Sequence, residues 1–202
     1  MARRNLEGLR IVITGASQGI GKALALEAAK RGMRVVAAAR SADLLYDLAS
    51  EAKPGIKGSL ATVVADITEA SGRQAMLQCA INHFGGVDVL VNNAGIGATG
   101  HFAEGSAETL RKIMEVNYFG LAETTRIFIP ELKTSAHAAI VNISSIAGKR
   151  GIPARADYSA SKFAVQGFSN ALRAELAKDN IDVLVICPGL TQTNFSKNMI
   201  EQ

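Results

Sequence analysis

A tyrosine and a lysine late in the chain have the residue types and the spacing needed for proton transfer. Tyr158 and Lys162 stand four residues apart in the segment Tyr-Ser-Ala-Ser-Lys. On a helix, residues at this spacing project from the same face. An ammonium beside a phenol stabilises the phenolate and lowers the phenol's pKa from about 10, so the pair could serve as a general acid/base near neutral pH. Taken alone, the same pattern also fits a solvated helix face.

Composition predicts one globular domain. The chain has 202 residues, 48% of them hydrophobic and 20% charged, with a net charge of +4. Its positive residues are dispersed apart from Arg3-Arg4, and no apolar run approaches the roughly 18 residues of a membrane helix. Cys79 and Cys187 lack C-x-x-C spacing and are expected to be reduced thiols. We therefore expect a cytoplasmic protein without nucleic-acid, membrane or metal partners.

Short β-branched runs alternate with longer amphipathic segments, which predicts a doubly wound parallel α/β sheet of the Rossmann type. A tail at residues 1–8 precedes a single domain at 9–202, and Lys53-Pro54-Gly55 marks a break between elements. The predicted strands are 9–14, 33–39, 60–65, 87–91, 138–143 and 181–186. The predicted helices are 19–31, 42–51, 69–84, 106–132 and 156–178.

A glycine-rich turn joins the first strand to the first helix. Glycines there allow tight backbone geometry, and a helix N-terminus favours a pyrophosphate. The spacing G-x-x-x-G-x-G differs from the usual G-x-G-x-x-G dinucleotide fingerprint. The candidate cofactor-binding residues in this turn are Gly15, Ser17, Gln18, Gly19, Ile20 and Gly21.

The same turn also matches G-x-S-x-G, the nucleophile elbow of serine hydrolases. Ser17 would be the nucleophile, and His83, His101 or His137 would have to supply the base. This remote alternative places the elbow on the first strand, and no histidine stands in a convincing context.

The end of the second predicted strand carries an arginine where many dinucleotide folds have an acidic residue. That carboxylate, about 20 residues past the glycines, bonds the ribose 2′-hydroxyl of NAD. Here the sequence reads Ala38-Ala39-Arg40-Ser41. Because the Arg40 guanidinium suits a 2′-phosphate, the sequence favours NADP(H) over NAD(H).

Together these motifs resemble the classical short-chain dehydrogenase/reductase family along nearly the whole chain. The ordered set comprises the glycine turn, Asn92-Asn93-Ala94-Gly95, Asn117, Ser145, Tyr158-x-x-x-Lys162 and Pro188-Gly189. Each motif is weak alone, but the ordered set is specific.

The resemblance implies four catalytic residues. Ser145 would stabilise the substrate oxyanion, and Tyr158 would act as general acid/base. Lys162 would lower the pKa of Tyr158 and bond the nicotinamide ribose. Asn117, an unfavourable residue inside a helix, would hold a water in a proton relay.

Further cofactor contacts are implied by position in the family. Asp66 and Ile67 would lie at the adenine, Asn93 and Gly95 at the adenosine side, and Pro188, Gly189, Thr191 and Thr193 at the nicotinamide. Asp66 would equally fit near a helix N-cap, and the two threonines would equally fit an ordinary loop.

We expect an NADP(H)-dependent oxidoreductase that interconverts a carbonyl and an alcohol. The family has a further C-terminal strand and helix beyond the residues present here, so a non-catalytic NADP(H)-binding protein is the alternative. The apolar residues Phe163, Val165 and Phe168 suggest a homodimer or homotetramer contact on the tyrosine helix, although core packing explains them as well.

Overall fold

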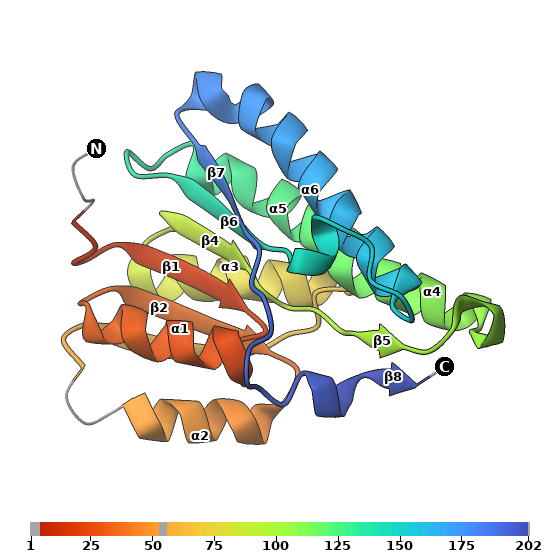
Figure 1. The fold of residues 1–202 in the computed structure, drawn as a ribbon. Coiled ribbons are helices and arrows are strands. Elements are labelled where there is room, and N and C mark those ends of the chain that lie inside the picture. The colour runs from red at the N-terminus through yellow and green to blue at the C-terminus, as the bar shows by residue number, and fades with distance from the viewer. Residues whose placement is uncertain (1–4, 53–55, 202) are drawn as a thin grey trace.

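The predicted sheet is confirmed in a computed structural model, which describes residues 5–52 and 56–201. Six parallel strands lie in the order β3-β2-β1-β4-β6-β7 (Figure 1). They are β1 Arg10–Thr14, β2 Arg34–Ala39, β3 Ser59–Val64, β4 Val89–Asn92, β6 Ala139–Ile143 and β7 Asp182–Ile186. The expected break at Lys53-Pro54-Gly55 and the first half of the expected tail lie outside the described residues, while Leu6 packs against the core.

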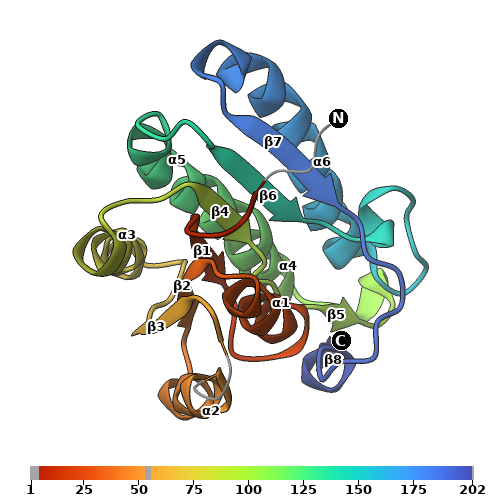
Figure 2. The same ribbon diagram turned by 90° about the vertical axis from the view of Figure 1, so that its left-hand side faces the viewer.

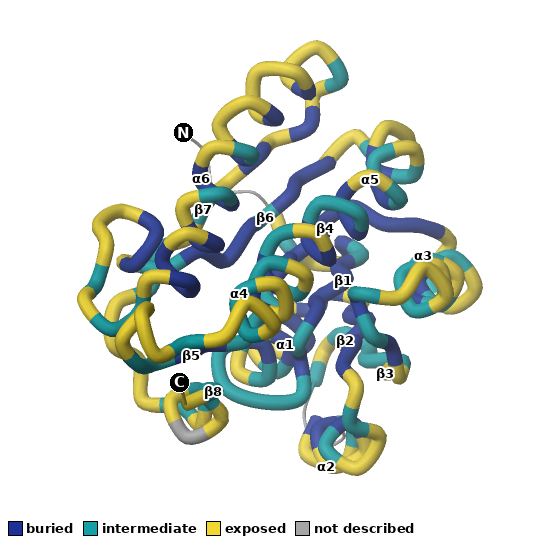
Figure 3. The backbone as a smooth tube through the Cα atoms, turned by 90° about the vertical axis from the view of Figure 1, so that its right-hand side faces the viewer, coloured by how far each residue is buried: buried dark blue, intermediate teal, exposed yellow. Residues whose placement is uncertain are grey.

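Helices cover both faces of this sheet and create two hydrophobic cores, as the continuous apolar strands require (Figure 2). On one face, α1 Gly19–Lys30 and α2 Ala42–Ala52 pack against strand residues such as Ile13 and Val35. On the other face, α3 Ala70–Phe84, α5 Gly120–Leu132 and α6 Ala156–Leu176 pack against Val12 and Leu90. Burial is greatest along the central strands, and the outer sides of the helices are exposed (Figure 3).

Strand order determines where a ligand can bind. The chain leaves β1 toward β2 and β3 on one side, and later returns through β4, β6 and β7 on the other. In open parallel sheets the crevice for ligands lies beyond the carboxyl ends of the strands at this reversal. The glycine turn after β1 and the Asn92-Asn93-Ala94-Gly95 segment around the end of β4 meet there.

The long helix predicted at 106–132 is interrupted by a π-helical turn. Helix α4 spans Ala107–Met114, the π turn Glu115–Phe119, and α5 follows directly. Ser106 caps α4, since its Oγ accepts a hydrogen bond of 3.0 Å from Thr109 N. Asn117 lies within the π turn, so an asparagine, which is unfavourable in a regular helix, coincides with the irregularity.

A second sheet was not predicted. Strand β5 Ala98–Thr99 pairs in parallel with β8 Ile200–Glu201, and Ile200 N donates to Gly97 O at 3.0 Å. This pairing brings the end of the described chain back to the carboxyl edge of the main sheet (Figure 1). Four short 3-10 helices complete the described elements: Phe102–Glu104, Ile146–Gly148, Ala177–Asp179 and Ser196–Asn198.

The edge strand β7 leaves apolar side chains exposed on the face that α1 and α2 cover elsewhere. Leu184 is 44% exposed and Ile186 46% exposed. One outward carbonyl is satisfied internally, because Arg173 Nε donates to Val183 O at 2.8 Å. No helix among residues 5–52 and 56–201 has both the length and the apolarity needed to cross a membrane.

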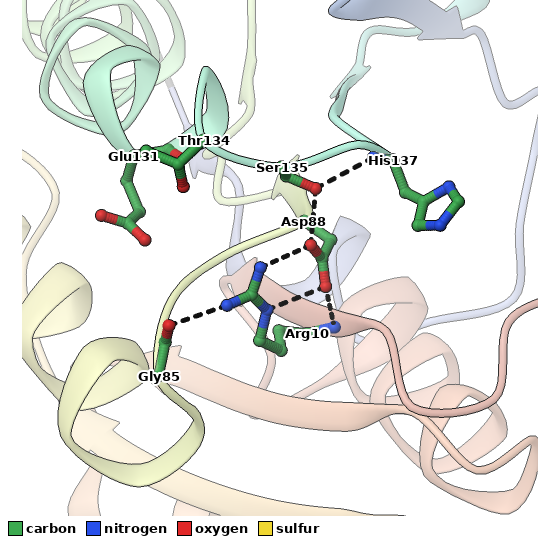
Figure 4. Close-up of polar contacts among 7 residues, drawn as sticks. All are labelled: Arg10, Gly85, Asp88, Glu131, Thr134, Ser135 and His137. Carbon is green, nitrogen blue, oxygen red and sulfur yellow. Dashed lines mark hydrogen bonds and ion pairs between the residues drawn. The ribbon is translucent and has the colours of Figure 1, made fainter.

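At the amino ends of the strands an ion pair ties β1 to β4 (Figure 4). The Arg10 guanidinium donates to both Asp88 carboxylate oxygens, at 2.9 and 2.7 Å, and to Gly85 O at 2.7 Å. Asp88 also accepts from Arg10 N at 2.8 Å and from Ser135 Oγ at 2.6 Å. Although burial opposes ionisation, these donors lower the pKa of Asp88 to about 2.

Candidate active site

The glycine turn has a geometry that only glycine can supply. Gly15 and Gly19 have φ angles of 64° and 55°, in the left-handed region. A Cβ on Gly15 would lie 2.7 Å from Ala94 Cα, and one on Gly21 would overlap Gly15 O. These close approaches hold the turn against the strand ends and leave the N-terminus of α1 open.

That helix N-terminus fits an anionic group. Gln18 is the N-cap but makes no side-chain capping bond, and the first turn of α1 contains no acidic residue. The first N–H groups and the positive end of the helix dipole therefore remain uncompensated by the described chain. The pyrophosphate of a dinucleotide is the group that such a cradle accommodates.

Asn93 supports the turn from behind. Its Nδ2 donates to Thr14 O at 2.9 Å and to Gly15 O at 3.0 Å, while Thr14 Oγ1 accepts from Asn93 N at 3.0 Å. The side chain is thus committed to the turn, although the residue also lines the cavity in front of it.

A cavity of about 520 Å³ runs from the glycine turn to Tyr158. Most of the predicted residues line it. They are Gly15, Ser17, Gln18, Gly19, Ile20, Arg40, Asp66, Ile67, Asn93, Gly95, Ser145, Tyr158, Lys162, Pro188, Gly189, Thr191 and Thr193. Gly21 and Asn117 are buried behind the wall instead. No histidine within the described ranges lines this cavity, so Ser17 has no neighbouring histidine base of the kind that a serine hydrolase needs.

At one end of the cavity, Arg40 follows β2 with a 66% exposed side chain. Its guanidinium lies 3.8 Å from Asp66 Oδ2. The other carboxylate oxygen of Asp66 accepts from Thr68 N at 2.9 Å and Thr68 Oγ1 at 2.8 Å, so Asp66 forms a turn before α3 and is not its N-cap. An exposed arginine at this place can reorient toward a ligand phosphate.

At the other end, Ser145 and Tyr158 both line the cavity, and the Ser145 hydroxyl acts on the Tyr158 phenol. Ser145 follows β6 and caps the 3-10 helix Ile146–Gly148, with Oγ accepting from Ala147 N at 3.1 Å. Burial raises the pKa of Tyr158, while the Ser145 hydrogen bond and the charge of Arg155 oppose that rise. The expected lowering by Lys162 is therefore not what this structure shows: the net pKa direction is upward because desolvation prevails.

Lys162 is buried with no carboxylate partner among the described residues. Its Nζ donates to Ile143 O at 3.0 Å and lies 5.8 Å from the centre of the Tyr158 ring. Burial lowers the pKa of this ammonium to about 8, and the charge of Cys187 acts in the opposite direction. An ammonium whose pKa lies this close to physiological pH remains mostly protonated there and can still exchange protons.

Asn117 bridges the π turn to the loop after β4. Its Oδ1 accepts from Ile96 N at 2.8 Å, and its Nδ2 donates to Ile96 O at 2.9 Å and Ser161 Oγ at 3.0 Å. A Cβ on Gly95 would stand 3.1 Å from Asn117 Oδ1 and 3.4 Å from Lys162 Nζ. Gly95 therefore lies beside Asn117 and Lys162, while its contact with the adenosine side stays a prediction.

The segment after β7 crosses the mouth of the cavity. The Phe195 ring lies 5.8 Å from the Tyr158 ring at an angle of 54°, and Phe195 and Met199 pack over Gly97. Thr193 approaches Gly19. Sequence reasoning missed Phe195 and Met199 because nothing in their local pattern signals a return to β5.

Comparison with known proteins defines the class. The family described as short chain dehydrogenase matches residues 10–202. Dehydrogenase/reductase SDR family member 7B of Bos taurus is 38% identical over 199 residues, covering 94% of this chain and 60% of that relative. Ketoacyl reductase HetN from Nostoc is 34% identical over 192 residues, covering 95% of this chain and 67% of that relative.

Solved structures agree. A short chain dehydrogenase/reductase from Burkholderia phymatum in complex with NAD superimposes with a TM-score of 0.92 and 31% identity, covering 97% of this chain and 70% of that one. An alcohol dehydrogenase from Thermococcus sibiricus complexed with 5-hydroxy-NADP superimposes with a TM-score of 0.87 and 29% identity, covering 95% of this chain and 80% of that one. This chain belongs to the short-chain dehydrogenase/reductase family of nicotinamide-dependent oxidoreductases, and it spans 60% of the Bos taurus relative's length.

Proposed function

We propose that the protein is an NADP(H)-dependent oxidoreductase that interconverts a carbonyl compound and an alcohol. The observation that carries this proposal is the single cavity that joins an open helix N-terminus to the Ser145–Tyr158 pair. When bound, the nicotinamide would supply the hydride for reduction of the carbonyl carbon.

The chain's own residues would handle the proton. Ser145 Oγ donates a hydrogen bond to the substrate oxygen and stabilises the negative charge that develops there. Tyr158 gives its phenolic proton to that oxygen, which completes the alcohol, and the reverse reaction returns the proton to Tyr158. The raised pKa of Tyr158 keeps this proton on the phenol before reaction.

Lys162 would help to return a proton to Tyr158 after the tyrosine has given its own to the substrate. Of its three ammonium N–H groups, one is held by Ile143 O, so the others are available to a ribose hydroxyl or a water. Asn117 fixes the wall beside it through both backbone groups of Ile96. This arrangement favours a proton path that leaves the site past Lys162.

Preference for NADP(H) is proposed from Arg40 and from the absence of a carboxylate in Ala39-Arg40-Ser41. The two solved relatives hold NAD in one case and 5-hydroxy-NADP in the other, so the choice depends on this chain's own residues. Arg40→Ala should weaken NADPH binding by about 10-fold and leave NADH binding nearly unchanged. Equal effects on both cofactors would contradict the preference.

The function is tested with Tyr158→Phe, which removes the proton donor and keeps the ring. We expect turnover of a carbonyl panel with NADPH to fall by about 1,000-fold, while NADPH affinity, measured by fluorescence titration, stays within about 2-fold. Tyr46→Phe on the exposed side of α2 is the matched control and should behave as the wild type. Normal reduction by Tyr158→Phe would overturn the mechanism.

The same assay separates the second candidate, a cofactor-binding protein without turnover. It is favoured by one observation, the exposure of the apolar side chains Leu184 and Ile186 on the edge strand β7. Tight NADPH binding with no reduction of any carbonyl would support that candidate.

We further propose a cytoplasmic homo-oligomer that assembles through the outer side of α6. Phe163 on α6 is 45% exposed and Phe119 is 48% exposed, whereas Val165 is buried in the core and cannot contribute. Sedimentation of the wild type and Phe163→Glu would test this contact, which predicts a smaller species for the variant.

A further inference from the structure

The turn that precedes the tyrosine helix holds an alanine in a strained conformation. Ala154 has a φ of 58°, one of two positive values at non-glycine residues in the described chain. Its carbonyl accepts from Gly100 N at 3.0 Å, which clamps the turn to the end of β5. Such strain persists only where surrounding contacts impose it, and it tends to concentrate at functional positions.

The residue that this turn positions is Arg155. Its backbone is fixed on both sides, since Arg155 N donates to Ile152 O at 3.1 Å and Arg155 O accepts from Ser159 N at 2.8 Å. Helix α6 starts at the next residue, so Arg155 stands at i−3 from Tyr158 on the same face. It is half-buried and lines the cavity, and its positive charge acts on the Tyr158 phenol.

Of the three cationic residues in this loop, Arg155 is the one that faces the reacting end of the cavity. Lys149 and Arg150 precede it in the same loop but are exposed and do not line the cavity. Lys162, the other cation there, is buried against Ile143 O. The hydrogen bonds recorded for Arg155 within the described ranges are made by its backbone, which leaves the guanidinium donors for a ligand.

We propose that Arg155 binds an anionic group of the substrate, so that the enzyme favours oxo acids over neutral carbonyl compounds. A guanidinium presents paired donors that match a carboxylate in two parallel hydrogen bonds. The position of Arg155 one helical turn before Tyr158 would place that carboxylate beside the carbonyl to be reduced. This inference rests on the proposed function and narrows its substrate class.

Neighbouring charge defines the competing explanation. Asp157, two residues further on, is buried and has an interaction of its own. If Arg155 merely supported the start of α6 through such neighbours, its removal would harm all substrates alike. The proposal requires instead an effect confined to anionic substrates.

The experiment compares benzoylformate and levulinate with their methyl esters in the full chain with NADPH. The wild type should favour each acid in kcat/KM, and Arg155→Gln should lower kcat/KM for the acids by about 10- to 100-fold, mainly through KM, with the esters changed less than about 2-fold. Arg155→Lys should restore part of the loss. Arg150→Gln, which removes a charge from the same loop outside the cavity, should match the wild type.

A binding measurement keeps this inference separate from the proposed function. Calorimetry of benzoylformate binding to the protein loaded with NADP⁺, which cannot reduce it, should show tighter binding than its methyl ester, and Arg155→Gln should abolish that difference. Such a result without turnover would sustain the anion site while contradicting the proposed activity. Equal losses for acids and esters, or no preference for acids in either assay, would overturn the anion site.

Discussion

The two ends of the parallel sheet treat buried charge in opposite ways. At the amino ends of β1 and β4, the Asp88 carboxylate receives hydrogen bonds from Arg10 and Ser135 on every side (Figure 4). At the carboxyl ends, the Lys162 ammonium is buried with a single recorded bond to Ile143 O. Both groups are charged and largely withdrawn from water, yet within the described part of the chain only Asp88 contacts a group of opposite charge.

The consequence appears in their pKa values. The pKa of Asp88 falls to about 2, so the carboxylate is locked in its ionised form at every physiological pH. The pKa of Lys162 falls to about 8, so this ammonium is poised to lose its proton. Compensated charge therefore serves stability at one end, and uncompensated charge serves proton transfer at the other.

Among the variants that test this comparison, Lys162→Met should have the largest effect, a loss of turnover. It keeps the length of the side chain and removes the charge. Turnover should fall by about 100-fold or more, since the proton path past Tyr158 is lost. The free energy of unfolding at pH 7 should stay level or rise by up to about 2–3 kcal/mol, because a buried cation is removed. Denaturant unfolding and NADPH-coupled kinetics measure the two quantities.

The comparison would fail if Lys162→Met unfolded the protein. A large loss of stability would mean that the lysine is a structural tie across the strand ends and not a functional cation. Lys178→Met, at an exposed position after α6, controls for removal of one positive charge.

Asp88→Asn should have the opposite effect, a loss of stability with unchanged turnover. Arg10 would lose its carboxylate while its side chain remains only 22% exposed, so we expect stability to fall by about 2–3 kcal/mol. Turnover per folded molecule should not change, because Asp88 lies at the far end of the strands from Tyr158. Thermal unfolding combined with kinetics below the transition tests both, and altered catalysis in folded Asp88→Asn would break the comparison.

The pH dependence of the free energy of unfolding should show the same contrast between Asp88 and Lys162. Because the folded pKa of Asp88 is lowered, its contribution of about 2 kcal/mol is fully present above the unfolded pKa near 4 and is lost as the pH falls toward 2. Lys162 acts on the alkaline side: its folded pKa is also lowered, so stability should increase as the pH rises from about 8 toward 10.5. Denaturant titrations across this range should show the acid slope shrink in Asp88→Asn and the alkaline slope shrink in Lys162→Met.

Ser135→Ala should have the smallest effect. It removes one donor to Asp88, at 2.6 Å, and leaves the Arg10 fork in place. We expect a loss of about 1 kcal/mol and a small upward shift of the Asp88 pKa, measured by denaturant unfolding and by titration of the carboxyl group. A loss as large as that of Asp88→Asn would mean that Arg10 contributes little to the cluster.

The sequence predicted the main sheet because its signals are local. Runs such as Leu9–Thr14 are apolar on both faces, and glycines end several elements, so the type of each element and the succession of elements along the chain follow from these patterns. The pairing of β5 with β8 could not be predicted, since a strand of two residues has no period and its partner lies a hundred residues away. Edge contacts of that kind depend on the completed fold.

The features of the candidate active site likewise fall into those that the sequence could identify and those that it could not. Residues whose backbone or chemistry is specialised, such as Gly15 and Tyr158, could be identified from type and spacing. Lys162 was identified too, but the net pKa of Tyr158 is raised and not lowered, because the sequence does not reveal how strongly burial acts on the phenol. The strained conformation of Ala154 was missed, since an alanine in the left-handed region carries no compositional signal.

The π turn at Glu115–Phe119 has a consequence for how this protein could change over evolution. A π turn is an α-helix with one residue too many, so deletion of a single residue there would restore a regular helix from α4 into α5. The regular helix would be the more favourable backbone, yet it would rotate Asn117 away from Ile96 and Ser161 by about 100°. The extra residue of this turn therefore makes the backbone less regular, and it holds the wall beside Lys162 in place.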